Sequence, residues 1–208
     1  GIDLEGFSDH EIENEENTIL YFGTLIRKKG ALELPLIFNE VCKNNKNVKL
    51  ILIGRDASDI LSGNTSTWKM MQELFDTRAI QNVIYLGSVP YNEIKNSIAK
   101  ASVCVFPTFA EALPLSWIEA MTMNKAIVAS NIGWANEVIE DSVSGFLVHP
   151  LSHKEYAQKI QELLQNEKLR YLFGVEARKK VEQEFSISVV AKKNAEFYEK
   201  TILRCKND

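Results

Sequence analysis

The chain has 208 residues, of which 45% are apolar and 25% are charged, a composition typical of a soluble globular protein with a substantial core. Twenty-four basic and 28 acidic residues give a formal net charge of −4, which argues against nucleic-acid binding as the main activity. No apolar run approaches the ~20 residues of a membrane-spanning helix, and no signal peptide opens the chain.

The three cysteines favour a reduced, cytoplasmic setting. They are odd in number and lack metal-ligand spacing, and Cys42 and Cys104 lie in apolar runs, as small core residues do. The three histidines are scattered, and Asp56 and Asp59 form only an isolated Asp-x-x-Asp pair in a polar loop. We therefore expect no bound metal ion.

After an irregular, acidic lead-in over residues 1–17, short apolar runs alternate with amphipathic segments. The apolar runs predict buried strands over residues 18–23, 48–54, 83–87, 102–106, 126–130 and 145–148. Helices are predicted over residues 31–44, 68–77, 91–100, 114–123, 154–166, 168–184 and 189–203, and residues 136–140 are predicted to form a short helix or a turn. Pro114 suits the first turn of its helix, and Ser152-x-x-Glu155 is a capping-box pattern.

This alternation predicts an α/β fold: a doubly wound, mostly parallel six-stranded Rossmann-like sheet with a helical C-terminal tail. No repeat or linker divides the chain, so we expect residues 1–208 to form one domain. Ligands of such sheets bind beyond the carboxyl ends of the strands. The residues that follow strands are therefore the candidates: 24–30, Arg55, 88–90, 109–115 and 130–133.

The helix that follows the fourth strand carries the first candidate site. Its apolar residues cover most of its circumference, which predicts burial, yet it contains Glu119, whose carboxylate then needs a partner. Glu111 lies eight residues earlier, in the loop before the helix. A helix N-terminus attracts phosphate and carboxylates accept hydrogen bonds from hydroxyls, so the segment predicts a ligand with both groups. The alternative is that Glu111 is a solvated loop residue and Glu119 lies at an exposed helix edge.

The second candidate is the loop from Gly23 to Gly30, which places Arg27, Lys28 and Lys29 between two glycines after the first strand. Lysine suits phosphate, and glycine permits close approach of backbone. Read alone, the loop fits a solvated basic turn equally well. Its place at the carboxyl edge, beside the Glu111–Glu119 segment, favours function.

Several nucleotide-binding and catalytic motifs are missing from the sequence. There is no Gly-x-Gly-x-x-Gly after the first strand, no Walker A loop and no Gly-x-Ser-x-Gly elbow. These absences disfavour a nicotinamide or flavin enzyme, a P-loop NTPase and an α/β-hydrolase.

The segment Glu111-Ala-Leu-Pro-Leu-Ser-Trp-Ile-Glu119 resembles the Glu-x7-Glu signature of the family 4 retaining glycosyltransferases. The Gly23–Gly30 loop, residues 131–137 and residues 144–148 resemble other blocks of that family, in order and with the right spacing. Gly1-Ile-Asp3 in the lead-in and residues 170–185 in the tail also resemble segments of that family. The resemblance implies the C-terminal, donor-binding domain of a GT-B enzyme, with an N-terminal acceptor domain absent from this chain.

The resemblance also implies roles for individual residues. Glu111 would bind hydroxyls of the donor sugar, Glu119 the ribose hydroxyls, and Lys29 the diphosphate as it leaves. The backbone N–H groups of Leu115 and Ser116 would hold the distal phosphate. The remaining predicted contacts with the donor are Gly23, Thr24, Arg27, Arg55, Val89 through its backbone to the base, and Leu113.

Three positions depart from the family pattern. Thr24 stands where the family has an arginine, so that one of two diphosphate cations is missing, and Arg27 and Arg55 are the candidates to replace it. Pro114 replaces a glycine near the phosphate, and Trp134 replaces the second glycine of a pair beside the donor pocket.

We therefore expect a glycosyltransferase, hexosyltransferase-like, that uses a UDP- or GDP-sugar without a metal or other cofactor. The alternatives are a sugar-nucleotide 2-epimerase domain and a non-catalytic nucleotide-sugar-binding module. The expected partners are the donor and the protein's own N-terminal domain, with no nucleic acid. Alone, this chain is expected to bind donor weakly and to transfer nothing. Polysaccharide biosynthesis is one role the resemblance allows, and attachment of the full-length enzyme to the inner face of the membrane stays open.

Overall fold

The computed structural model describes residues 1–7 and 15–207. The structure contains one six-stranded sheet, and every strand pair in it is parallel, with the order β3-β2-β1-β4-β5-β6. The strands are β1 (Thr18–Phe22), β2 (Lys49–Ile53), β3 (Val83–Tyr85), β4 (Val103–Phe106), β5 (Ile127–Ser130) and β6 (Phe146–Val148). The predicted fold class is confirmed, and the observed strands are one or two residues shorter because the flanking residues turn into loops.

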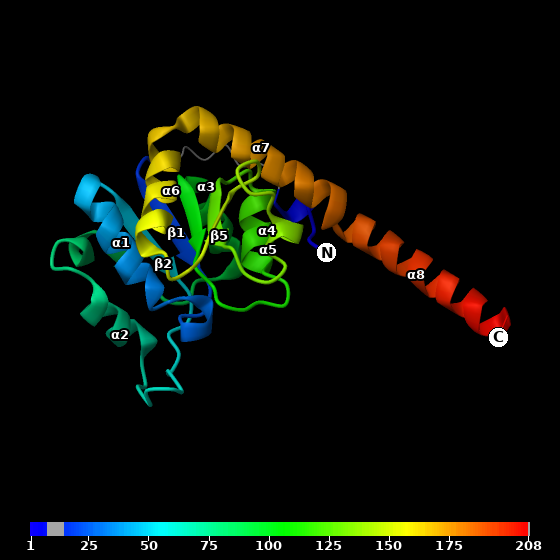
Figure 1. The fold of residues 1–208 in the computed structure, drawn as a ribbon, viewed down its shortest axis with the longest axis horizontal. Coiled ribbons are helices and arrows are strands. Elements are labelled where there is room, and N and C mark those ends of the chain that lie inside the picture. The colour runs from blue at the N-terminus through cyan, green and yellow to red at the C-terminus, as the bar shows by residue number, and fades with distance from the viewer. Residues whose placement is uncertain (8–14, 208) are drawn as a thin grey trace.

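The helices lie on both faces of the sheet. They are α1 (Glu33–Asn44), α2 (Thr67–Leu74), α3 (Tyr91–Lys100), α4 (Leu115–Thr122), α5 (Ala135–Val138), α6 (His153–Gln165), α7 (Glu167–Glu184) and α8 (Ile187–Asn207), with short 3-10 turns η1 (Glu5–Phe7), η2 (Arg27–Lys29) and η3 (Ala79–Asn82). Helices α1 and α6 pack together in front of the sheet, while α3 and α4 lie behind it (Figure 1). Right-handed crossovers produce this arrangement, because the chain winds outward from β1 to β3 and then from β4 to β6.

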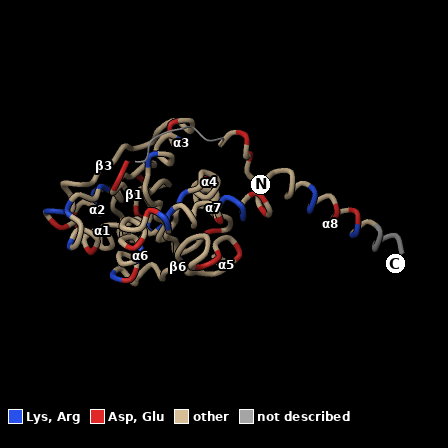
Figure 2. The backbone as a smooth tube through the Cα atoms, turned by 90° about the horizontal axis from the view of Figure 1, so that it is seen from above, with Lys and Arg blue, Asp and Glu red and all other residues tan. Residues whose placement is uncertain are grey.

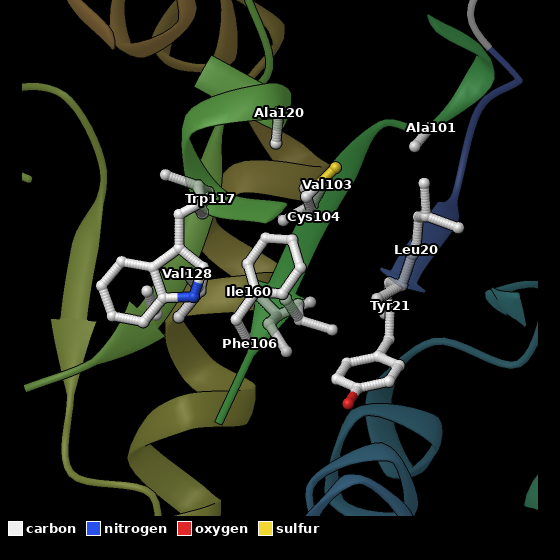
Figure 3. Close-up of a cluster of buried hydrophobic side chains, with 14 of the residues drawn as sticks. Leu20, Tyr21, Ala101, Val103, Cys104, Phe106, Trp117, Ala120, Val128 and Ile160 are labelled. Carbon is white, nitrogen blue, oxygen red and sulfur yellow. The ribbon is translucent and has the colours of Figure 1, made fainter. Parts of the chain in front are cut away.

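The apolar strands form the centre of the core. Every residue of β1, β4, β5 and β6 is buried, as expected for parallel strands covered on both faces. At the carboxyl ends the rings of Tyr21, Phe106 and Trp117 make a continuous row (Figure 3). The ring centroids lie 6.3 Å apart for Tyr21 and Phe106 and 6.4 Å apart for Phe106 and Trp117. These rings form the floor beneath the loops that follow the strands.

Helix α8 leaves the body of the molecule (Figure 1). Its residues from Ala191 to Ile202 are all exposed, including Phe197 and Tyr198. Basic and acidic residues are interspersed along the chain, α8 included (Figure 2). Within the described residues, no helix is both long and apolar enough to cross a bilayer.

Several local predictions were wrong. Ser152 is the residue before α6, but its side chain makes no capping hydrogen bond, so the capping box does not form. The next residue, His153, instead places Nε2 2.6 Å from Oε2 of Glu33 on α1. Helix α2 ends at Leu74, three residues earlier than predicted, and α8 begins two residues earlier, at Ile187. Of the lead-in, Ile2 and Phe7 are buried, and residues 8–14, with His10, lie outside the described residues.

Candidate functional site

The strand order brings the loops after β1 and β4 together. Strand β1 is flanked by β2 on one side and by β4 on the other, so the winding direction reverses between β1 and β4. Crevices for ligands form at such reversals, beyond the carboxyl ends of the strands. The two candidate segments of the sequence follow these two strands.

The basic loop after β1 is fixed against the loop after β4. Gly30 has φ +71°, and a Cβ built there would lie 1.8 Å from the carbonyl oxygen of Pro107. The carbonyl of Lys28 accepts hydrogen bonds from the Phe109 N–H at 2.9 Å and the Thr108 hydroxyl at 3.2 Å. The turn that carries Lys29 is therefore part of the fold and not a free solvated loop.

The backbones after β1 and β2 also touch. A Cβ on Gly54 would lie 2.0 Å from the carbonyl oxygen of Gly23, so this close approach requires glycine at position 54. The buried phenol of Tyr21 donates to the carbonyl of Thr24 at 3.1 Å, which holds the first residues of the basic loop. Thr24 thus contributes backbone position but no charge.

Lys29 lies against the first acidic residue of the Glu-x7-Glu segment. Its Nζ is 3.4 Å from Oε1 of Glu111. Burial raises the pKa of Glu119, and the charge of Lys29 is one of the influences that oppose this rise. Both members of the Lys29–Glu111 pair are partly buried. The structure therefore brings together the three residues to which the sequence assigned the phosphate and hydroxyl contacts.

Glu119 has the partner that its burial required. The phenol of Tyr91, the first residue of α3, donates to Oε1 of Glu119 at 2.8 Å. Burial raises the pKa of Glu119, while the Tyr91 hydrogen bond and the charges of Lys95 and Lys29 oppose that rise. Burial and the neighbouring carboxylate raise the pKa of Tyr91 to about 12. Sequence reasoning missed Tyr91, although its place directly after the 88–90 loop was a signal that could have found it.

The N-terminus of α4 faces the same region. Pro114 occupies the N-cap position of α4, one residue before the first helical turn. The prediction that Pro114 lies in that turn was therefore wrong by one residue. Within the part of the chain that the structure describes, the N–H groups of Leu115 and Ser116 have no hydrogen-bond acceptor. Leu113 and Leu115 expose their side chains. Two backbone donors are thus available for an anion at this helix end.

The two arginines proposed to replace the missing cation differ in their surroundings. Arg27 makes a bidentate pair with Asp59, with Nε–Oδ1 at 3.0 Å and Nη2–Oδ2 at 2.7 Å. Arg55 is exposed and makes no ion pair among the described residues. Engagement of Arg27 by a phosphate would break its pair with Asp59, whereas Arg55 has no such pair to lose in the described part of the chain.

A pocket of about 180 Å³ adjoins Glu111. Its walls include Thr108, Phe109, Trp117 and Trp134, so the unusual Trp134 does line the space next to the site. Trp117 is buried and its Nε1 has no hydrogen-bond partner within the described residues. Val89 lies partly buried two residues before Tyr91.

Among the side chains that the structure describes, in residues 1–7 and 15–202, no group of three or more His, Cys, Asp or Glu could hold a metal ion. The two aspartates of the Asp-x-x-Asp pair have other partners. Asp56 accepts from the N–H of Trp68 and the hydroxyl of Ser66 at the start of α2, and Asp59 binds Arg27.

A family model described as "Glycosyl transferases group 1" matches residues 4–180. The chain belongs to this family. It is 29% identical over 181 residues to the capsular polysaccharide biosynthesis glycosyltransferase CapM of Staphylococcus aureus. This alignment covers 87% of this chain and 45% of CapM. It is 26% identical over 181 residues to the alpha-D-kanosaminyltransferase of Streptomyces kanamyceticus, covering 86% of this chain and 45% of that protein. The chain spans about half the length of the curated relatives it matches.

Solved structures of this fold place the chain within the GT-B architecture. The C-terminal domain of the group 1 glycosyltransferase LpcC from Francisella tularensis superposes with a TM-score of 0.74 at 23% identity, over 90% of this chain and 100% of that one. Anabaena HepE, solved in complex with UDP-glucose, superposes with a TM-score of 0.78 at 21% identity, over 96% of this chain and 56% of HepE. The group 1 chain described here therefore has the fold of a GT-B C-terminal domain.

Proposed function

We propose that the protein is the donor-binding half of a retaining glycosyltransferase that uses a nucleotide-diphosphate sugar, UDP- or GDP-linked. The observation that carries the proposal is the position of Lys29, 3.4 Å from Glu111 and within electrostatic reach of Glu119. A cation paired with one carboxylate, and near enough to a second to act on its pKa, matches a ligand that carries hydroxyls on both sides of a diphosphate.

The diphosphate lies at the N-terminus of α4 in this proposal. The N–H groups of Leu115 and Ser116 donate to the distal phosphate, and the helix dipole favours its charge. Lys29 stabilises the negative charge that grows on the diphosphate as it leaves. No metal ion is required for this role, because the cation is supplied by the side chain.

The two carboxylates bind the sugars on either side of the diphosphate. Glu111 accepts hydrogen bonds from the donor sugar, which extends toward the pocket lined by Trp134. Glu119 accepts from the ribose, and the backbone of Val89 contacts the base. HepE was solved with UDP-glucose and TarM of S. aureus with UDP, which supports a nucleotide ligand for this fold.

The reaction retains the configuration at the transferred carbon. The bond between that carbon and the diphosphate oxygen breaks, and an acceptor oxygen forms its bond on the same face. The acceptor proton moves to the departing phosphate oxygen. Lys29 and the α4 N–H groups stabilise the leaving group, while Glu111 holds the sugar hydroxyls.

The acceptor site belongs to the protein's own N-terminal domain in this proposal. The relatives are about twice as long as this chain, and α8 leaves the body with Phe197, Tyr198 and Ile202 exposed. The likeness to CapM supports polysaccharide biosynthesis. The proposal places the full-length enzyme in the cytoplasm, at the inner face of the membrane.

The test is to incubate the full-length protein with a panel of UDP- and GDP-sugars and to follow transfer, epimerisation and binding. We expect release of the nucleoside diphosphate with transfer of the sugar, and loss of transfer in Glu111→Gln with nucleoside diphosphate affinity kept within about threefold. Sugar transfer by the isolated 208-residue chain would contradict the assignment of the acceptor site to another domain.

One observation favours a second candidate, the non-catalytic nucleotide-sugar-binding module. Thr24 provides no charge, and Arg27 is already paired with Asp59. Fewer positive charges are therefore available to stabilise a leaving diphosphate. Binding without turnover across the donor panel would support this candidate, and epimerisation would support the sugar-nucleotide 2-epimerase.

A further inference from the structure

Tyr91 joins two elements that the proposed function treats separately. It is the first residue of α3, directly after the loop that carries Val89, and its phenol donates to Glu119 of α4 at 2.8 Å. The hydrogen bond therefore links the segment assigned to the base with the carboxylate assigned to the ribose.

The ring of Tyr91 is held in place and yet accessible. It packs edge to face against Phe7, with ring centroids 6.3 Å apart and an interplanar angle of 86°. Lys95 lies one turn along α3, with Nζ 5.7 Å from the Tyr91 centroid and 4.6 Å from that of Phe7, and it donates to the carbonyl of Gly6. Despite these contacts, Tyr91 is 55% exposed. Phe7 itself is buried.

The hydrogen bond leaves acceptor capacity on Glu119. A carboxylate has two oxygens and about four lone-pair positions, and Tyr91 occupies one of them on Oε1. The carboxylate can still accept from vicinal hydroxyls, but its rotation is restricted. A carboxylate held in one orientation loses less entropy when it binds, which is the usual gain from preorganisation.

We propose that Tyr91 is a positioning residue for the nucleoside, which orients the Glu119 carboxylate toward the ribose hydroxyls and offers its exposed ring to the base. This inference rests on the proposed function, because it takes the nucleotide-sugar site as given. It adds the residue that determines recognition of the nucleoside, and it separates the two parts of Tyr91: the hydroxyl acts through Glu119, and the ring contacts the base directly.

The two parts predict different losses. Removal of the hydroxyl in Tyr91→Phe weakens binding of a ribonucleotide about 3- to 10-fold, in line with the entropy lost when one unrestrained side chain is immobilised on binding. A ligand without the 2′ and 3′ hydroxyls gains nothing from an oriented Glu119, so its affinity stays within about twofold. Tyr91→Ala also removes the ring, and a base that packs on an aromatic ring loses a further 5- to 100-fold for either ligand.

The experiment titrates UDP and GDP into the full-length protein by calorimetry and continues with the tighter of the two and its 2′,3′-dideoxy form. The variants are Tyr91→Phe, Tyr91→Ala and, as matched control, Tyr171→Phe, which removes the hydroxyl of a tyrosine that is 70% exposed on α7. We expect Tyr91→Phe to lower the affinity for the ribonucleotide alone and Tyr91→Ala to lower the affinity for both ligands. Tyr171→Phe should change neither affinity.

Two results would overturn the inference while leaving the proposed function intact. In the first, Tyr91→Phe binds the ribonucleotide with the same affinity as the unchanged protein. In the second, its affinities for the ribonucleotide and for the 2′,3′-dideoxy form fall equally, as they would if Tyr91 were merely structural. If the unchanged protein binds neither UDP nor GDP, the proposed function fails and this inference fails with it.

Discussion

Replacement of Lys29 by alanine is the most direct test of the diphosphate site. Its Nζ lies 3.4 Å from Oε1 of Glu111, its side chain is 32% exposed, and it is the only side-chain cation that the proposal places on the diphosphate. A charge-assisted contact of this kind contributes about 1.5 to 3 kcal/mol net of solvation. At about 1.4 kcal/mol for each tenfold change, Lys29→Ala should weaken UDP or GDP binding roughly 10- to 150-fold.

The assay is calorimetric titration of the full-length protein, with thermal unfolding measured on the same samples. Loss of the Lys29–Glu111 pair should cost about 1 kcal/mol of stability or less, because both groups keep some contact with solvent. Affinity should therefore fall far more than stability. Lys29→Arg retains the charge and is expected to recover part of the affinity.

Lys28→Ala is the matched control. It removes the same charge from the neighbouring residue, whose side chain is exposed and whose contacts to Thr108 and Phe109 are made by its backbone carbonyl. If Lys29→Ala and Lys28→Ala both bound the nucleotide within twofold of the unchanged protein, the assignment of Lys29 to the diphosphate would be wrong.

Two further predictions concern the loops that carry the site. Gly30→Ala should lower the free energy of unfolding in urea by at least about 2 kcal/mol more than Gly63→Ala does. Both glycines have positive φ, but only at Gly30 would the new Cβ contact the backbone, 1.8 Å from the carbonyl oxygen of Pro107. Equal losses would show that the close approach to Pro107 does not constrain the loop. Arg27 holds the pKa of Asp59 well below its usual range, so the stability from this pair is complete above about pH 4 and is lost as the pH falls. Asp59→Asn should lower the urea midpoint at pH 7 and flatten its decline between about pH 4 and pH 2, whereas parallel curves would refute that reasoning.

The sequence predicted elements well where burial is nearly complete. The runs that became β1 and β4 are apolar at every position except Thr18 and are buried at every position, so their pattern strongly favoured buried strands. The capping box at Ser152 was wrong for a physical reason. A capping box is a local pattern, but the neighbouring His153 is paired with Glu33, which lies far away in the sequence.

The same contrast holds for the site. Glu119 was predicted to need a partner because a charge on an apolar helix is costly, and that argument needs no tertiary structure. The identity of the partner, Tyr91, depends on how α3 and α4 pack behind the sheet, which no spacing in the sequence records. Arg27 was proposed as a diphosphate ligand, and only the folded chain shows that Asp59 holds it.

The sequence by itself predicted a parallel sheet, the cation and the first carboxylate on loops after its strands, and the second carboxylate on the helix that follows, because hydrophobic periodicity and turn residues are local signals. The tertiary structure decided that β1 and β4 are neighbours. Strand order depends on the direction of each crossover, which is a property of packing between distant segments. That order places Lys29 against Glu111, and thereby makes one site from two loops that lie about eighty residues apart in the chain.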